Sequence, residues 1–122
     1  MAAQDLKERT FLFAVAVSNL TSVLPYNIIN KEHFRQIIRS SASIGANYRA
    51  ARRTKSDADF LNKLKIVEEE ADETLYFLEL LSALNPEYQE IINPLLKEGT
   101  EILKIIVASI NTVRLKISQT KK

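Results

Sequence analysis

The sequence predicts an all-α protein: an antiparallel four-helix bundle whose helices run up, down, up and down, in a single domain spanning residues 1–122. Apolar residues recur at steps of three and four in four successive segments, which is the spacing of one helical face. The chain has only two glycines and three prolines, too few for the turns of a β-sandwich or an α/β fold. Long helices with short connections pack antiparallel to their sequence neighbours.

The first predicted helix spans about residues 4–24 and is apolar on more than one side. Its main stripe consists of Leu6, Phe13, Val17, Leu20 and Leu24. Phe11 and Val15 lie off that stripe, so a monomeric bundle would leave part of this apolar surface in water. Pro25 ends the helix, because the residue before a proline avoids the α conformation.

The second predicted helix spans about residues 31–53, with Asn30 as its N-cap. Its inward stripe is Phe34, Ile37, Ile38, Ser41, Ile44, Gly45 and Tyr48. Small residues dominate positions 41–47, and Gly45 costs ~1 kcal/mol relative to alanine inside a helix. This patch indicates the close approach of another helix. Asn47 is then a half-buried amide that needs hydrogen-bond partners, or alternatively a ligand contact.

The third predicted helix spans residues 57–84. Ser56 is a good N-cap for it, and Asp59 three residues later forms a weaker version of the capping box. Its stripe is Phe60, Leu64, Val67, Ala71, Leu75, Leu78 and Leu81. At ~1.5 Å per residue the helix is about 40 Å long, so other helices must lie alongside it.

Two Asn-Pro pairs divide the last part of the chain. Asn85–Pro86 predicts a short helix over residues 86–92, because proline suits the first helical position. Asn93–Pro94 predicts a kink or break before the fourth long helix, about residues 94–117. Its apolar stripe, with a mean step of about 3.5 residues that suits low-angle helix packing, is Ile92, Leu96, Gly99, Leu103, Ile106, Ile110, Val113 and Ile117.

Charge is divided unevenly along the chain. Residues 31–55 hold seven Lys and Arg and one acid, whereas residues 56–90 hold two Lys and ten acids. The candidate basic face of the second helix and the turn after it consists of Arg35, Arg39, Arg49, Arg52, Arg53 and Lys55. One interpretation is a nucleic-acid-binding face with cations spaced along a phosphate backbone. The other is pairing with the acidic third helix, with a favourable helix-dipole effect at the C-terminus.

Acidic residues of the third helix include Glu70 and Glu73, which share a stripe with apolar residues. A carboxylate on an apolar face must find a partner, and the arginines of the second helix are the candidates. A metal or general-acid role is the alternative. A di-iron bundle needs Glu-x-x-His on two helices, and His33 is the only histidine. Together with the lack of a phosphate loop or nucleophile elbow, this predicts no enzyme activity, no cofactor and no metal site.

The sequence predicts a cytoplasmic protein. Its longest apolar run, residues 11–17, is far shorter than the ~20 residues of a membrane span, so no membrane association is expected. Asp5 and Glu8 interrupt the positive region that a signal peptide would need. The chain has no cysteine, which agrees with a reducing compartment.

Several short motifs together resemble a known family. They are Arg39-Ser-Ser-Ala-Ser-Ile-Gly-Ala-Asn47, Asp59-Phe60, Lys63-Leu64, Glu69-Glu-Ala-Asp-Glu-Thr74, Tyr76-Phe-Leu-Glu79 and, in the first helix, Phe13-Ala14. The chain resembles, over nearly its whole length, the four-helix-bundle proteins first met as reading frames in intervening sequences of bacterial 23S rRNA genes. The combination of residues 43–47 with residues 70–74 is the most specific part.

The resemblance implies a bacterial four-helix bundle, often a ring-like homopentamer, without a settled biochemical activity. Related accessory proteins of diversity-generating retroelements bind nucleic acid and a reverse transcriptase through a basic surface. The residues that match the family's polar pattern, and so form an expected structural polar network, are Arg39, Ser43, Asn47, Glu70 and Glu73. Ala50 departs from that pattern, since many relatives have an acid there, and this removes one polar partner for Asn47 or Arg39.

Two functions are therefore expected from the sequence. The first is a non-enzymatic, homo-oligomeric scaffold or interaction protein that associates with itself and with a protein partner. The second is a nucleic-acid-binding accessory module that contacts RNA or DNA through the basic face of the second helix.

Overall fold

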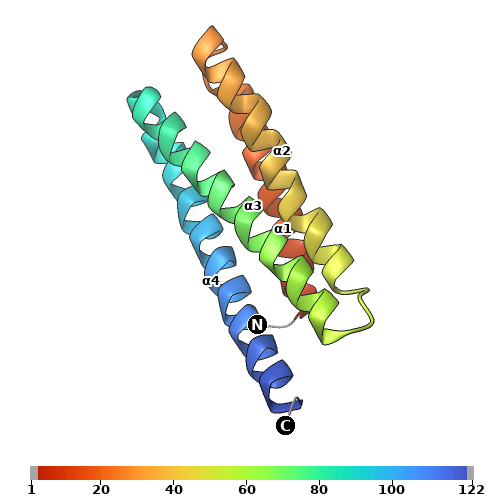
Figure 1. Cartoon of the computed structure of the whole chain (residues 1–122). Coiled ribbons are helices and arrows are strands. Elements are labelled where there is room, and N and C mark those ends of the chain that lie inside the picture. The colour runs from red at the N-terminus through yellow and green to blue at the C-terminus, as the bar shows by residue number, and fades with distance from the viewer. Residues whose placement is uncertain (1–2, 121–122) are drawn as a thin grey trace.

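The computed structural model of the chain describes residues 3–120, with side chains from residue 6 onward. Its elements are α1 (Ala3–Val23), α2 (Ile28–Ala51), α3 (Asp57–Leu84), the short 3-10 helix η1 (Pro86–Tyr88) and α4 (Gln89–Thr120). Consecutive long helices run in opposite directions, and the described residues contain no strand (Figure 1). The predicted all-α bundle is confirmed.

The four helices pack as the corners of a square. α2 packs on α1 and α3, and α4 packs on α3 and α1, whereas the backbones of α1 and α3 lie diagonally across the core from each other. Each helix therefore has two neighbours and presents its remaining surface outward. No stretch of the helices between residues 3 and 120 combines the length and hydropathy that a bilayer-spanning segment needs.

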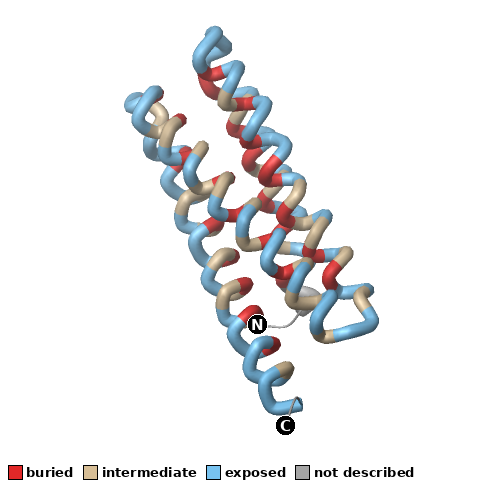
Figure 2. Tube along the Cα trace, in the orientation of Figure 1, coloured by how far each residue is buried: buried red, intermediate tan, exposed pale blue. Residues whose placement is uncertain are grey.

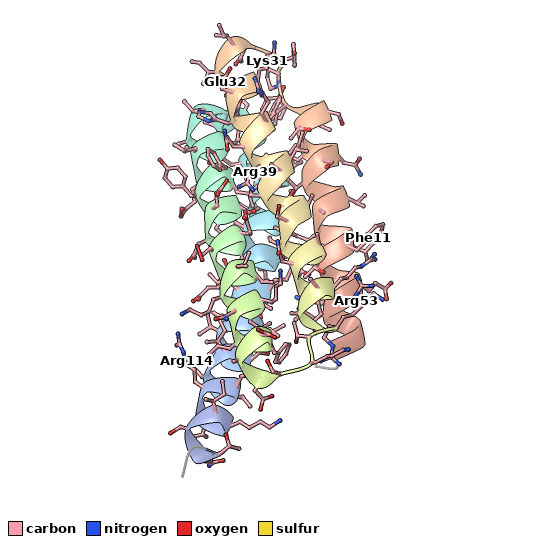
Figure 3. All side chains as sticks on the ribbon, turned by 45° about the vertical axis from the view of Figure 1, so that its right-hand side comes forward. Phe11, Lys31, Glu32, Arg39, Arg53 and Arg114 are labelled. Atoms are coloured by element: carbon pink, nitrogen blue, oxygen red, sulfur yellow. The ribbon has the colours of Figure 1, made fainter. Side chains whose placement is uncertain are left out.

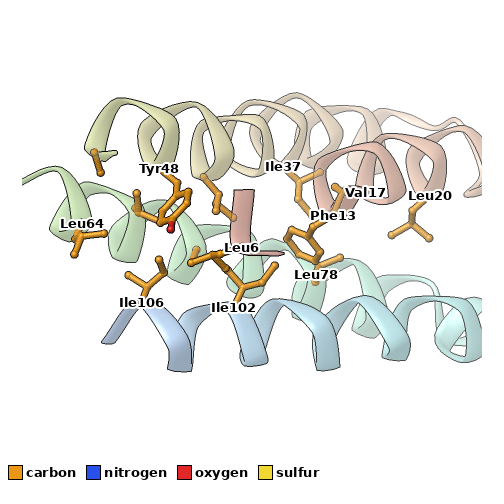
Figure 4. Close-up of a cluster of buried hydrophobic side chains, with 14 of the residues drawn as sticks. Leu6, Phe13, Val17, Leu20, Ile37, Tyr48, Leu64, Leu78, Ile102 and Ile106 are labelled. Carbon is orange, nitrogen blue, oxygen red and sulfur yellow. The ribbon is translucent and has the colours of Figure 1, made fainter. Parts of the chain in front are cut away.

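The core lies between the inward stripes of the four helices (Figures 2 and 4). All five residues of the predicted α1 stripe are buried. Burying a large aliphatic or aromatic side chain stabilises the fold by ~1.5–3 kcal/mol, so these stripes supply most of the driving force. Ile38 was wrongly predicted to point inward and is 41% exposed. Ile37 occupies the inward position, and the next helical residue is rotated by about 100° from it.

The start of α2 differs from the sequence prediction. The N-cap is Asn27, whose side-chain oxygen accepts a 2.8 Å hydrogen bond from the Asn30 amide, and the helix begins at Ile28. The prediction of Asn30 as the cap was wrong because Ile28 and Ile29 are exposed and add nothing to the apolar stripe. The helix ends at Ala51 rather than at residue 53.

Asn30 has a different role, as half of a buried amide pair with Asn85. Asn30 Nδ2 donates to Asn85 Oδ1 at 2.8 Å, and Asn85 Nδ2 donates to Asn30 Oδ1 at 3.0 Å. The two amides also donate to the backbone carbonyls of Pro25 and Leu81. This pair ties the α1–α2 connection to the end of α3.

α3 has its predicted bounds, and Ser56 caps it by accepting a 3.1 Å hydrogen bond from the Asp59 amide. Of the kink or break predicted at Asn93–Pro94, the break is wrong, because α4 runs unbroken from Gln89 with Pro94 in its second turn. Only residues 86–88 form the separate short helix. Pro94 is exposed, so α4 loses one backbone hydrogen bond on the solvent side and continues.

Candidate interaction surfaces

The basic residues predicted on the second helix are all exposed, but they do not form one continuous face. Arg35 and Arg39 lie in the first half of α2, whereas Arg49 lies in its last turn. Arg52 and Arg53 follow the helix end, and Lys55 lies in the connection to α3. Arg39 and Arg49 are about 15 Å apart along the helix axis.

Arg39 is held by two acids of α3. Its Nη2 atom lies 3.1 Å from Glu70 Oε1 and 2.5 Å from Glu73 Oε2. The hydrogen bonds that Arg39 donates to Glu73 and, to a smaller extent, to Glu70 raise the pKa of Arg39 above its ordinary value. The expected pairing between arginines of α2 and acids of α3 thus holds at this position. The side chain is 49% exposed, so the pair adds little to stability, of the order of 1 kcal/mol or less.

The other residues of the predicted polar network bond locally. Ser43 Oγ donates to the Arg39 carbonyl at 2.9 Å, and Asn47 Nδ2 donates to the Ser43 carbonyl at 2.9 Å. The structure therefore brings Arg39 together with Glu70 and Glu73 but leaves Ser43 and Asn47 on the backbone of their own helix.

The fully buried polar contact between α2 and α3 is one that sequence reasoning missed. The Ser40 and Thr74 hydroxyl oxygens lie 2.8 Å apart, and Thr74 Oγ1 also lies 2.8 Å from the Glu70 carbonyl oxygen. A hydroxyl has one proton, so there are two arrangements. In one, Thr74 donates to Ser40 while Ser40 donates to the Ile37 carbonyl. In the other, Thr74 donates to the Glu70 carbonyl while it accepts from Ser40. Their positions in the sequence could have indicated that both are buried. Ser40 lies one turn after the stripe residue Ile37, and Thr74 lies one turn after the stripe residue Ala71.

A basic cluster forms where α1 lies beside the end of α2. Lys7 of α1 joins Arg49, Arg52 and Arg53 around a hollow of about 250 Å³. Among the side chains of residues 6–120 the ion pairs join Arg9 to Glu98, Arg39 to its two acids and Lys116 to Asp57, and they include none of these four cations. The sequence did not predict the contribution of Lys7, because it comes from another helix. The negative end of the α2 dipole stabilises the three arginines. It does not neutralise them, so the cluster stays positively charged.

An apolar groove of about 430 Å³ runs from this cluster between α1 and α2. Phe11 and Val15 form its α1 side and are 55% and 42% exposed, while Ala42, Gly45 and Ala46 belong to its α2 side. Phe11 and Arg53 project from the same side of the molecule (Figure 3).

Gly45 explains why α1 and α2 lie so close together beside the groove. A Cβ atom at this position would lie 3.2 Å from Thr10 Oγ1, so a side chain would press on α1. The predicted role of the small-residue patch, the close approach of another helix, is confirmed at Gly45.

The outer face of α3 is acidic and also carries exposed apolar residues. Glu69, Asp72 and Glu79 are exposed and form no ion pair with any described residue. Tyr76 is 57% exposed and Ile66 is 37% exposed on the same helix. This face lies on the side of the bundle away from α1.

Among the side chains of residues 6–120, no group of three or more His, Asp or Glu residues is arranged to hold a metal ion. His33 packs against Phe77, with 5.8 Å between the ring centroids. The distinctive features of the described surface are the groove, the basic cluster and the acidic face of α3.

The fold places this chain among small antiparallel four-helix bundles, and comparison with known proteins identifies its family. The sequence model of the 23S rRNA-intervening sequence protein family matches residues 3–108. The chain belongs to this family. Among curated proteins, none matches the sequence.

A solved relative supports the same fold. It is the crystal structure of a protein of unknown function from the S23 ribosomal protein family of Bacteroides thetaiotaomicron VPI-5482. The two sequences are 38% identical over 86% of this chain and 97% of the other, and the TM-score is 0.75.

Proposed function

We propose that this protein is a non-enzymatic, homo-oligomeric scaffold of the bacterial cytoplasm, whose helices present surfaces to other copies of the chain and to a protein partner. The observation that supports this most directly is the apolar outer side of α1. Phe11 and Leu12 are each more than half exposed, Val15 is 42% exposed, and Phe11 and Val15 line the groove. Exposed apolar side chains that line a groove mark interaction sites.

The energetics favour burial of this side in an assembly. When a neighbouring copy covers an apolar side chain, the free energy of association gains ~25 cal/mol per Å² of buried apolar area. A few residues of this size therefore supply several kcal/mol. A ring of five copies, which the family resemblance implies, is one arrangement that would cover them.

The test compares matched surface variants by size-exclusion chromatography at micromolar concentration. The Phe11→Ser/Val15→Ser variant should elute as a smaller species than the wild type. Leu115→Ser, which removes a 61% exposed leucine of α4, should elute like the wild type. Unchanged elution of the Phe11/Val15 variant, with helical content intact by circular dichroism, would contradict a role for this surface.

A nucleic-acid-binding accessory role is the second candidate, favoured by the convergence of Lys7, Arg49, Arg52 and Arg53. Four cations that contact four phosphates would give a logarithmic salt slope of about −3.6. Affinity would then fall by ~10²-fold between 50 and 200 mM salt. In an oligomer the cluster would be repeated, which would steepen the dependence.

Fluorescence anisotropy with single-stranded RNA and duplex DNA tests this candidate. Arg49→Ala/Arg53→Ala should weaken binding and reduce the slope, whereas Arg114→Ala on α4, outside the cluster, should leave both unchanged. Absence of binding by the wild type even at low salt would eliminate the candidate.

A further inference from the structure

We propose that the groove between α1 and α2 receives the outer face of α3 of a second copy of this chain. This inference rests on the proposed self-association and names the two surfaces that meet. The groove and the face are different surfaces of one molecule, so each copy would use both at once, one toward each neighbour.

The first argument is charge. The cations at the end of the groove have no acidic partner among the side chains of residues 6–120, and the groove lining contains no acidic residue. Glu69 and Asp72 on the outer face of α3 form no ion pair, and the one lysine beside them, Lys65, leaves that face with a net negative charge. If the acidic face of α3 docks on the groove, the acids and the cations neutralise each other. If two grooves packed together instead, neither lining would bring an acid to the basic cluster.

The second argument is apolar content and length. The face offers Ile66 and Tyr76 on either side of the acids, and an amphipathic ring such as Tyr76 is a common interface anchor. Residues 66–76 span about 15 Å along α3, and the α1 side of the groove, residues 7–19, spans about 18 Å. A helix face of this length fits along the groove beside Phe11 and Val15.

The third argument is topology. α1 and α3 are diagonally opposite in the bundle, so the groove and the outer face of α3 lie on different sides and neither blocks the other. Contact between two different surfaces is heterologous, and repetition of it gives a closed ring or an open filament rather than a two-fold dimer.

Two variants, each blocked on one surface, test the inference. Ala46→Glu places a carboxylate in the groove at an exposed helical position. The face variant combines Glu69→Lys, Asp72→Lys and Tyr76→Ser, all at exposed positions. Each variant alone should be a monomer of about 13.9 kDa, and an equimolar mixture should form a complex of twice that mass. The mixture should assemble because one partner keeps an intact groove and the other an intact face.

Ala108→Glu, at an exposed position of α4 that belongs to neither surface, is the matched control and should assemble like the wild type. Circular dichroism of each variant should show unchanged helical content. If the face variant assembles like the wild type, or the mixture stays monomeric, the inference is overturned although self-association stands. A wild-type chain that is itself monomeric would overturn both.

Discussion

Asn30 and Asn85 exchange two hydrogen bonds although 55 positions separate them in the chain. Each looks like a helix cap when the sequence is read locally, because asparagine commonly precedes a helix or a proline. Only the fold shows that both side chains are buried and satisfy each other. A pairing of this kind depends on which ends of the helices meet, so local sequence cannot predict it.

The buried amide pair gives a stability prediction. Asn30→Ala leaves the Asn85 side-chain oxygen and the Pro25 carbonyl without their partner. The free energy of unfolding in urea should fall by about 1–3 kcal/mol, the cost of an unsatisfied buried polar group. Asn62→Ala, at an exposed position of α3, is the control and should change it by less than ~0.5 kcal/mol. A change no larger in Asn30→Ala than in the control would contradict this role.

Tyr48 predicts how stability depends on alkaline pH. Burial raises the pKa of Tyr48 above its ordinary value of 10.0, while nearby Arg52 lowers it to a smaller extent. Above pH ~10 the unfolded chain loses this proton while the folded chain retains it, so the free energy of unfolding should fall as pH rises.

Urea unfolding at several pH values between 9 and 11 measures this contribution. Tyr48→Phe should reduce the alkaline slope, whereas Tyr26→Phe, at a 77% exposed position, should leave it unchanged. The same slope in Tyr48→Phe as in the wild type would show that burial of Tyr48 does not govern the effect.

At the scale of elements, the long helices could be predicted because apolar stripes repeat over many turns, and α3 has its predicted bounds. Helix ends were harder. Ile28 and Ile29 are helical but exposed, so the stripe does not indicate them. Pro94 reads locally as a break, yet the core contacts of Ile92 and of the residues after Gly99 hold α4 continuous.

Pro94 gives a prediction for α4. Proline costs ~3 kcal/mol relative to alanine inside a helix. Pro94→Ala also raises the conformational entropy of the unfolded chain, which lowers the stability of the fold by up to ~1 kcal/mol. The free energy of unfolding should therefore rise by about 2 kcal/mol. Pro25→Ala, in the connection between α1 and α2, is the control for the entropy that the unfolded chain gains when a proline is removed. This control should not raise the free energy of unfolding. A loss of stability in Pro94→Ala would mean that proline is preferred at this position.

The candidate surfaces were only partly visible in the sequence. The arginines of α2 and the acids of α3 stand out as runs of one charge, and the contact of Arg39 with Glu73 follows from their neighbouring helices. The sequence could not show that Lys7 completes the basic cluster or that α1 and α2 enclose a groove. Both depend on which helices become neighbours.

At the scale of the whole molecule, the basic cluster beside α1 and the acidic face of α3 make the bundle electrostatically two-sided. If these surfaces meet between copies, the contact should weaken as salt screens it, since the Debye length falls from ~10 Å at 0.1 M to ~3 Å at 1 M. Sedimentation velocity at these two salt concentrations should show weaker assembly in 1 M salt. More protein should then be needed to keep the copies associated. An assembly that strengthens with salt would instead indicate a purely apolar interface.

The molar mass of the wild-type chain in solution, measured by light scattering at micromolar concentration, tests the account most directly. A heterologous contact cannot close with two copies. The expected mass is therefore at least three times 13.9 kDa. A mass of one chain at all concentrations would contradict self-association, and a stable mass of two chains would contradict the docking of the α3 face in the groove.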